Sequence, residues 1–218
     1  MKKKNTEHPL TPDTYFHIYN RGINGENIFK NEGNYAFFLQ RYAHYISPVA
    51  NTYAYALLGN HFHFLVRIHS EATIRANLLT KQLGVIDVLS AQQKSIAELA
   101  NNQFAKLFNS YAQAINKQNE RTGSLFERSF RRVAISTNEY LLRMVYYIHY
   151  NPQKHGFVAD FRDYPHTSYP VFGTTQNTRI PRQEVFEWFG GKSDFFSYHQ
   201  LTNQYDRNWC DTYWIEED

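Results

Sequence analysis

Two histidines separated by a single residue are the first side chains whose spacing indicates chemistry. His61 and His63 lie in "GNHFHFLVRI" (59–68), where they alternate with phenylalanines. Because alternate residues of a β-strand share a face, both imidazoles would leave one side of the strand with Cα atoms about 6.5–7 Å apart, close enough to reach one ion. The same pattern also fits two polar residues on the open face of a sheet, so the pair alone leaves both interpretations open.

A tyrosine and an asparagine near the end of a predicted helix supply complementary chemistry. Tyr147 and Asn151 lie in "YYIHYNPQKHG" (146–156), four residues apart, and therefore share one helix face. A phenol is a poor nucleophile at its free pKa of about 10, and a divalent cation that polarises a target phosphate removes much of that handicap. Two imidazoles and an amide carbonyl suit Mg²⁺ or Mn²⁺, which predicts that strand and helix end meet around one ion.

Other tyrosines compete for the role of nucleophile. Tyr146 and Tyr150 lie about 100° and about 60° around the helix from Tyr147. Tyr111 is followed at i+4 by Ile115, so no ligand lies beside it. The position of Tyr147 in its motif and its i+4 partner favour it over these rivals.

The first predicted strand carries two further residues of interest. His17 and Tyr19 share one of its faces and could neighbour the ion. A hydrogen-bonded strand histidine is the simpler interpretation of His17.

The elements that must position these residues follow the order β-α-β-β-α-β-α. Gly59 and Asn60 are expected to supply the positive φ of a tight hairpin, Ser136 and Glu139 to form a capping box, and Pro152 to end the last helix at residue 151. Hydrophobic periodicity predicts strands at 14–23, 50–58, 61–68 and 124–136 and helices at 31–46, within 71–120 and at 136–151.

This order predicts an α+β fold of the ferredoxin-like split βαβ type, an antiparallel sheet with helices on one face. In the last helix, Leu141, Val145 and Ile148 form the apolar stripe expected to contact the sheet. The predicted organisation is a mobile N-terminal arm (1–13), a catalytic domain (14–155) with a helical insertion (about 71–120), and a loop-rich C-terminal extension of unknown role (156–218), with one short helix at about 183–189.

Composition narrows the function classes. The net charge of +3 and pI near 8.8 weakly favour a polyanionic partner, and arginines cluster in "RTGSLFERSFRRV" (121–133). One cysteine, Cys210, excludes an internal disulfide framework and a cysteine-rich zinc site. With no signal-peptide pattern and no apolar run near the ~18 residues of a membrane span, the expected location is the cytoplasm, without membrane association.

The motifs together resemble a known family. "NHFH" (60–63) on a strand followed by "YIHYNP" (147–152) on a later helix resembles the HUH single-tyrosine transposases, named for histidine-hydrophobic-histidine, and most of all their REP-associated tyrosine transposase branch. "HIYNRG" (17–22), "RTGSLFERSF" (121–130) and "DYPHTSY" (163–169) are similar to that branch too. The resemblance runs from about residue 14 to 173. The segment 71–120 is longer than that branch leads us to expect, and could be a DNA-recognition or dimerisation insertion.

The resemblance implies an enzyme of DNA transposition and recombination, acting on single-stranded DNA in the bacterial nucleoid. His61, His63 and Asn151 would bind Mg²⁺ or Mn²⁺, and Tyr147 would form a 5′-phosphotyrosine bond and release a 3′-hydroxyl. The partners would be single-stranded or hairpin DNA and, in a homodimer, a second copy of the chain. The expected phosphate contacts are Arg21, Arg121, Arg128, Arg131, Arg132 and Lys154.

Two other functions stay open. One is a catalytically silent DNA-binding regulator on the same fold, and the other is an HUH nickase of replication initiation or plasmid transfer. The intact set of His61, His63, Tyr147 and Asn151 speaks against the first. The short chain, with its histidines ahead of its tyrosine, speaks against the second.

Overall fold

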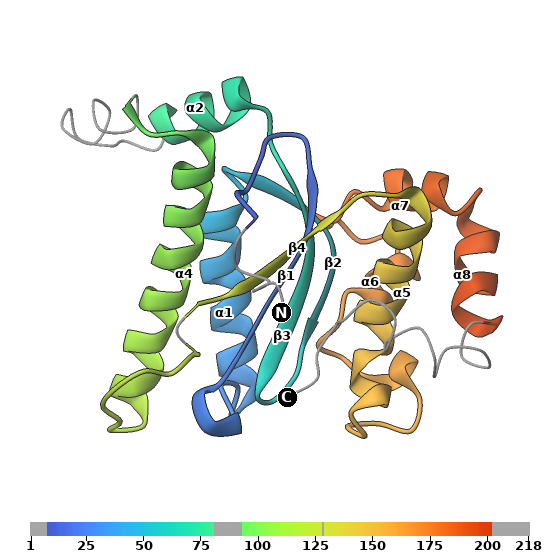
Figure 1. The fold of residues 1–218 in the computed structure, drawn as a ribbon. Helices are drawn as coiled ribbons and strands as arrows, with labels where there is room; N and C mark the ends of the chain where they lie inside the picture. Colours follow the sequence, from blue (N-terminus) through green and yellow to red (C-terminus); the bar gives the residue numbers. More distant parts are fainter. Residues whose placement is uncertain (1–7, 81–92, 128, 202–218) are drawn as a thin grey trace, which may run out of the picture. The chain divides into compact units, whose positions relative to one another are not determined.

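A four-stranded antiparallel sheet is the centre of the computed structural model, which describes residues 8–80, 93–127 and 129–201. The strands run in the order β2-β3-β1-β4 (Figure 1), the arrangement of a ferredoxin-like split βαβ fold. The predicted α+β class is therefore confirmed. The strands are β1 (Tyr15–Arg21), β2 (Ala50–Leu57), β3 (His61–Ile68) and β4 (Arg131–Ile135).

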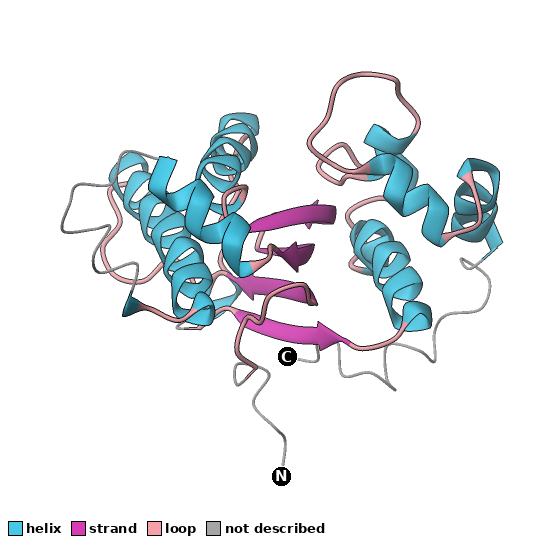
Figure 2. Cartoon of the chain, turned by 90° about the horizontal axis from the view of Figure 1, so that it is seen from above, coloured by secondary structure: helices cyan, strands magenta, loops and turns pink. Residues whose placement is uncertain are grey.

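Helices cover both faces of this sheet (Figure 2). α1 (Glu32–Ile46) and α4 (Ile96–Gln118) lie together on one face, whereas α5 (Asn138–Lys154) packs on the other, against β2 and β3. The prediction of helices on one face only is thus wrong for α5. The physical reason is that seven of the eight residues of β3 are buried, so both faces of the strand need a cover. The predicted insertion contains α2 (Glu71–Thr80) and α4.

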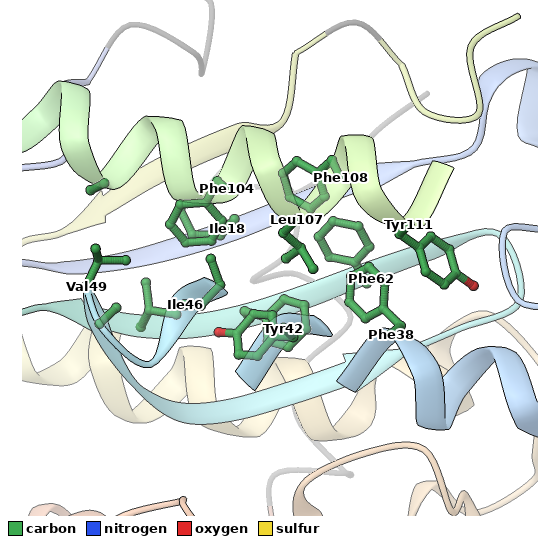
Figure 3. Packing of buried hydrophobic residues seen from close by; sticks show 14 of the residues in the cluster. Ile18, Phe38, Tyr42, Ile46, Val49, Phe62, Phe104, Leu107, Phe108 and Tyr111 are labelled. Carbon is green, nitrogen blue, oxygen red and sulfur yellow. The ribbon is translucent and has the colours of Figure 1, made fainter. Parts of the chain in front are cut away.

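The main hydrophobic core lies between the sheet and the α1–α4 face (Figure 3). Phe62 and Phe64 point into it, as the alternation in β3 predicts. The Phe64 ring stacks on Tyr42 of α1 at 4.1 Å, and the Phe62 ring lies 5.5 Å from Phe108 of α4. Burying each such ring is worth about 1.5–3 kcal/mol, so this face anchors β3 firmly and leaves its histidines on the opposite side.

The start of α5 differs from the prediction by one residue. Its N-cap is Thr137, whose side chain accepts a hydrogen bond from the Tyr140 N–H, so the predicted box of Ser136 and Glu139 is wrong. A complete capping box occurs instead at the start of α4, where Ser95 and Glu98 satisfy each other's backbone N–H.

The end of α5 differs by almost a turn. Pro152 lies inside the helix, which continues to Lys154. Pro152 cannot donate a backbone hydrogen bond, but the His155 N–H still donates to the Asn151 carbonyl at 3.1 Å, so the last turn persists. As a result Lys154 lies on the same helix as Tyr147, two turns further on.

The β2–β3 hairpin uses its glycine for space rather than for a positive φ. Neither Gly59 nor Asn60 has a positive φ, contrary to the prediction. A Cβ on Gly59 would lie 3.0 Å from Oδ1 of Asn27, and the Gly59 carbonyl accepts hydrogen bonds from the N–H groups of Ile28 and Phe29. A side chain at residue 59 would therefore displace the Asn27 side chain, because residues 27–29 pass close to the turn.

The segment after α5 closes the outer edge of β2. Thr167 forms a bridge with Ala56, the Leu57 N–H donates to the His166 carbonyl, and the Ser168 N–H donates to the Tyr55 carbonyl. These bonds satisfy backbone groups that an edge strand would otherwise expose. The segment also contains η2 (Phe161–Asp163) and α6 (Tyr169–Phe172).

Contacts divide the chain after Ile180. In the second unit, α7 (Arg182–Trp188) confirms the predicted helix near 183–189, and α8 (Lys192–Leu201) is a helix that the sequence interpretation left as loop. Of the predicted arm, residues 1–7 lie outside the described residues, while Leu10 is buried in the core of the first unit. Within the described ranges, no helix has the length and apolar character to cross a membrane.

Candidate functional site

The face of the sheet beneath α5 carries a cluster of aromatic and imidazole rings. In β3, His61 and His63 point toward α5, because their neighbours Phe62 and Phe64 occupy the opposite face. Antiparallel pairing places Tyr19 of β1 directly opposite His63. Both histidines are buried, so their protonation and hydrogen bonding are set by the protein rather than by bulk water.

His61 lies between two carbonyl oxygens. Its Nε2 is 3.1 Å from Oδ1 of Asn151, and its Nδ1 is 2.7 Å from Oδ1 of Asn60. Burial, reinforced by repulsion from His155, lowers the pKa of His61 to about 4, so the ring is neutral near pH 7. A neutral imidazole has one N–H. One of its two nitrogens therefore presents a lone pair to a carbonyl oxygen.

The spacing of Nε2 of His61 and Oδ1 of Asn151 is compatible with a shared cation for one of the two His61 tautomers. If the Nδ1 proton is donated to Asn60, then Nε2 of His61 and Oδ1 of Asn151 present lone pairs to each other at 3.1 Å. Two ligands of one octahedral Mg²⁺ at about 2.1 Å lie about 3 Å apart, so the two atoms fit a shared ion. Nδ2 of Asn151, by contrast, is buried without a hydrogen-bond partner among the described residues.

His63 is the deepest of the predicted ligands. Its Nδ1 lies 2.9 Å from Nε2 of His17, and its Nε2 is buried. Burial lowers the pKa of His63 well below its usual range, so a ring-nitrogen lone pair persists at neutral pH. Over the residues that the structure describes, no group of three or more His, Cys, Asp or Glu side chains could hold a metal. An ion here would therefore depend on the amide of Asn151 as a third ligand.

Tyr147 lies against the histidines of its own chain. Its side chain is 2% exposed, and its ring meets those of His63 and His17 edge-on, with centroids 5.7 and 6.1 Å apart. Nζ of Lys154 lies 5.1 Å from the centroid of the Tyr147 ring. The structure thus brings together Tyr147, His61, His63 and Asn151, as the sequence predicts; their roles stay predictions.

The other tyrosines considered as nucleophiles pack against aromatic rings or lie in the hydrophobic core. Tyr146 is buried and stacks on Tyr150 at 5.4 Å. Tyr111 lies in the core on the far side of the sheet, where its hydroxyl donates to the Ile28 carbonyl at 2.7 Å.

Two of the predicted DNA-contacting arginines lie on the face of the sheet that packs against α5, the helix that carries Tyr147. Arg21 ends β1 on the same face as Tyr19, and Arg131 lies opposite Tyr19 in β4, with its guanidinium 5.9 Å from that ring. Both pair with Glu127, at 3.7 and 3.5 Å. They form a partly exposed cationic pair beside the site.

The structure does not place Arg132 or Arg121, also predicted to contact DNA, beside Tyr147. Arg132 follows Arg131 and so points to the opposite face, where it donates to Oδ1 of Asn101 on α4 at 2.8 Å and lines a pocket of about 580 Å³. Arg121 bonds to Asn116 and Glu26. Arg128 lies outside the described residues.

Two further residues join the site. His17 is a hydrogen-bonded strand histidine, the simpler of the two interpretations of its position, and its partner is His63. His155 was assigned no role from sequence, yet its ring lies 4.8 Å from that of His61. The sequence feature that could have pointed to His155 is its position four residues after Asn151, one helical turn further on. A helix predicted to end at residue 151 does not place the two residues on one face.

Comparisons with known proteins agree with this fold. No family model matches the chain, and no curated protein matches it. Among solved structures, the chain is similar to a REP-associated tyrosine transposase bound to a REP hairpin, with a TM-score of 0.57 and 12% sequence identity. The match covers 79% of this chain and 86% of that one, and at this identity it establishes a shared fold.

Proposed function

We propose that this protein is a transposase-type enzyme that cuts and rejoins single-stranded DNA through Tyr147. The observation that carries the proposal is the convergence of Tyr147 with His61, His63 and Asn151, two of whose acceptor atoms lie 3.1 Å apart. The fold shared with a transposase that binds a DNA hairpin supports DNA processing as the general function.

In the proposed reaction, the Tyr147 oxygen attacks a phosphorus atom of the DNA backbone. The P–O3′ bond breaks, the tyrosine ester of the 5′-phosphate forms, and the leaving 3′ oxygen gains a proton while the phenol loses one. Attack by the 3′-hydroxyl reverses these changes and rejoins the strand. A divalent ion held by His61, His63 and Asn151 would withdraw charge from the phosphate.

Residues around the tyrosine are suited to the charges of this step. The Lys154 ammonium, 5.1 Å from the Tyr147 ring, stabilises negative charge as it develops on the phenol oxygen. Arg21 and Arg131 share one carboxylate, that of Glu127, so an arriving phosphate meets a net positive group. Hairpin recognition is proposed by analogy with the structural neighbour.

One observation favours a second candidate, a regulator that binds DNA without cutting it. Tyr147 is only 2% exposed on the face of α5 that packs on the sheet, so a phosphate reaches it only after α5 or the residues around it move. A protein that never opened this site would bind DNA through its arginines alone.

The test is formation of a covalent protein–DNA adduct. The full chain is incubated with Mn²⁺ or Mg²⁺ and labelled single-stranded hairpin oligonucleotides, and adducts that survive denaturation are counted. Tyr147→Phe is expected to abolish the adduct. Tyr150→Phe, one turn away on the same helix, is the matched control and should retain it.

Two results would contradict the proposal. An adduct that persists in Tyr147→Phe would assign the nucleophile elsewhere. Hairpin binding without any adduct, across a broad oligonucleotide library and with both metals, would favour the binding-only function.

A further inference from the structure

The imidazoles of His17 and His63 form a direct pair across two strands. Nε2 of His17 lies 2.9 Å from Nδ1 of His63, their ring planes differ by 15°, and their centroids are 5.1 Å apart. These values describe two nearly coplanar rings joined edge to edge by one hydrogen bond. Both side chains are completely buried, so no water competes for the bond.

The direction of this hydrogen bond decides whether His63 can bind a cation. If His63 donates from Nδ1 to His17, its Nε2 carries a lone pair. If His17 donates instead, His63 carries its proton on Nε2 and cannot be a ligand through that atom. The hydrogen bond between His17 and His63 therefore sets the tautomer of His63, in addition to packing the two rings together.

The other histidine of the strand has a corresponding arrangement. Nδ1 of His61 lies 2.7 Å from Oδ1 of Asn60, an atom that only accepts hydrogen bonds, so the tautomer that donates to Asn60 has its lone pair on Nε2. Each histidine thus has its Nδ1 engaged by a neighbouring residue, and each has its Nε2 directed elsewhere in the buried site. Outer partners of this kind orient metal-binding histidines.

We propose that His17 is a positioning residue, which accepts the Nδ1–H of His63 and thereby holds the Nε2 atom of His63 ready for a divalent cation. This inference rests on the proposed function, because it assigns a role within the same metal site. It goes beyond the predicted ligand set, since His17 itself does not bind the ion. With His63 as the donor, the remaining proton of His17 lies on its Nδ1, which has no hydrogen-bond partner among the described residues.

The proposal is tested by Mn²⁺ affinity, measured from the electron paramagnetic resonance signal of the free ion as the full chain is titrated. His17→Phe keeps the ring volume and removes the acceptor, and should weaken Mn²⁺ binding about ten- to a hundredfold. His17→Gln offers an amide oxygen to His63 and should restore most of that loss. His149→Phe is the matched control, because His149 is another buried histidine whose side chain forms a hydrogen bond, with Ser168 at 2.8 Å.

A second measurement reads the tautomer directly. Long-range ¹H–¹⁵N spectra of the full chain saturated with Mg²⁺ should show the His63 proton on Nδ1. A proton on Nε2, or unchanged Mn²⁺ affinity in His17→Phe while His63→Ala loses it, would overturn the role of His17 alone. Unchanged affinity in both His17→Phe and His63→Ala would overturn the metal site of the proposed function as well.

Discussion

His199 makes the second unit of the chain sensitive to acid. Its side chain is 1% exposed, packed 4.2 Å from the Phe195 ring, and Nδ1 lies 2.8 Å from the Phe195 carbonyl. Burial lowers the pKa of His199 from 6.5 to about 4, so the folded unit binds this proton less readily than the unfolded chain.

The sign and size of the effect follow from proton linkage. The free energy of unfolding of the second unit is highest above pH 6.5, where His199 is neutral in both the folded and the unfolded chain. It falls as the pH drops from 6.5 toward about 4, because the unfolded chain then binds the proton more readily. At about pH 5 the two pKa values correspond to a loss of about 2 kcal/mol, and at still lower pH the loss approaches about 3 kcal/mol. Because the unit is small, this loss should be visible as local opening of α8.

The assay is amide hydrogen exchange of α8 in the full chain at about pH 7.5 and about pH 5, after correction for the intrinsic pH dependence of exchange. The opening free energy of α8 should fall by about 2 kcal/mol on acidification. His199→Phe, which replaces the imidazole by a ring that cannot be protonated, should remove most of this fall, whereas exposed His44→Gln should leave it. An equal pH dependence in His199→Phe would refute the assignment of the effect to His199.

Three further perturbations give separate tests. Lys154→Met should slow adduct formation about tenfold at saturating hairpin DNA; an unaltered rate would remove Lys154 from the reaction. Phe62→Ala should lower the free energy of unfolding by about 3–5 kcal/mol, measured by denaturant titration, because it empties the centre of the core. Gly22→Ala places a Cβ 2.0 Å from the backbone oxygen of Glu26, so it should cost about 1–3 kcal/mol in the same measurement, and full stability would contradict the close approach.

Much of β3 could be predicted from sequence because its period is strict. The alternation of His61 and His63 with phenylalanines leaves two ways to orient the strand, and the apolar rings decide between them. Tyr147 and Asn151 could likewise be assigned to one helix face. The expectation that the strand and the helix meet came from their complementary chemistry and from the family resemblance, since no local pattern tells which face of a sheet a helix will cover.

The errors arose where neighbouring residues offer similar local chemistry. Ser136 and Thr137 are both good N-caps, and only the tertiary position of α5 selects Thr137. Pro152 disfavours a helix without forbidding its last turn. Gly59 looks like a turn glycine, but its φ is not positive and its near neighbour is the side chain of Asn27, which is distant in sequence and cannot be predicted from a local pattern.

The packing of α5 on its own sheet has a consequence for mixtures of variants. Each chain contains both the tyrosine and the histidines of the candidate site. A preparation of Tyr147→Phe mixed with a preparation of His63→Ala therefore contains no chain with a complete site. Recovery of adduct formation in such a mixture would require α5 helices to be exchanged between chains. Complementation therefore distinguishes an enzyme in which each chain uses its own α5 from one in which the site is completed by α5 of a second chain.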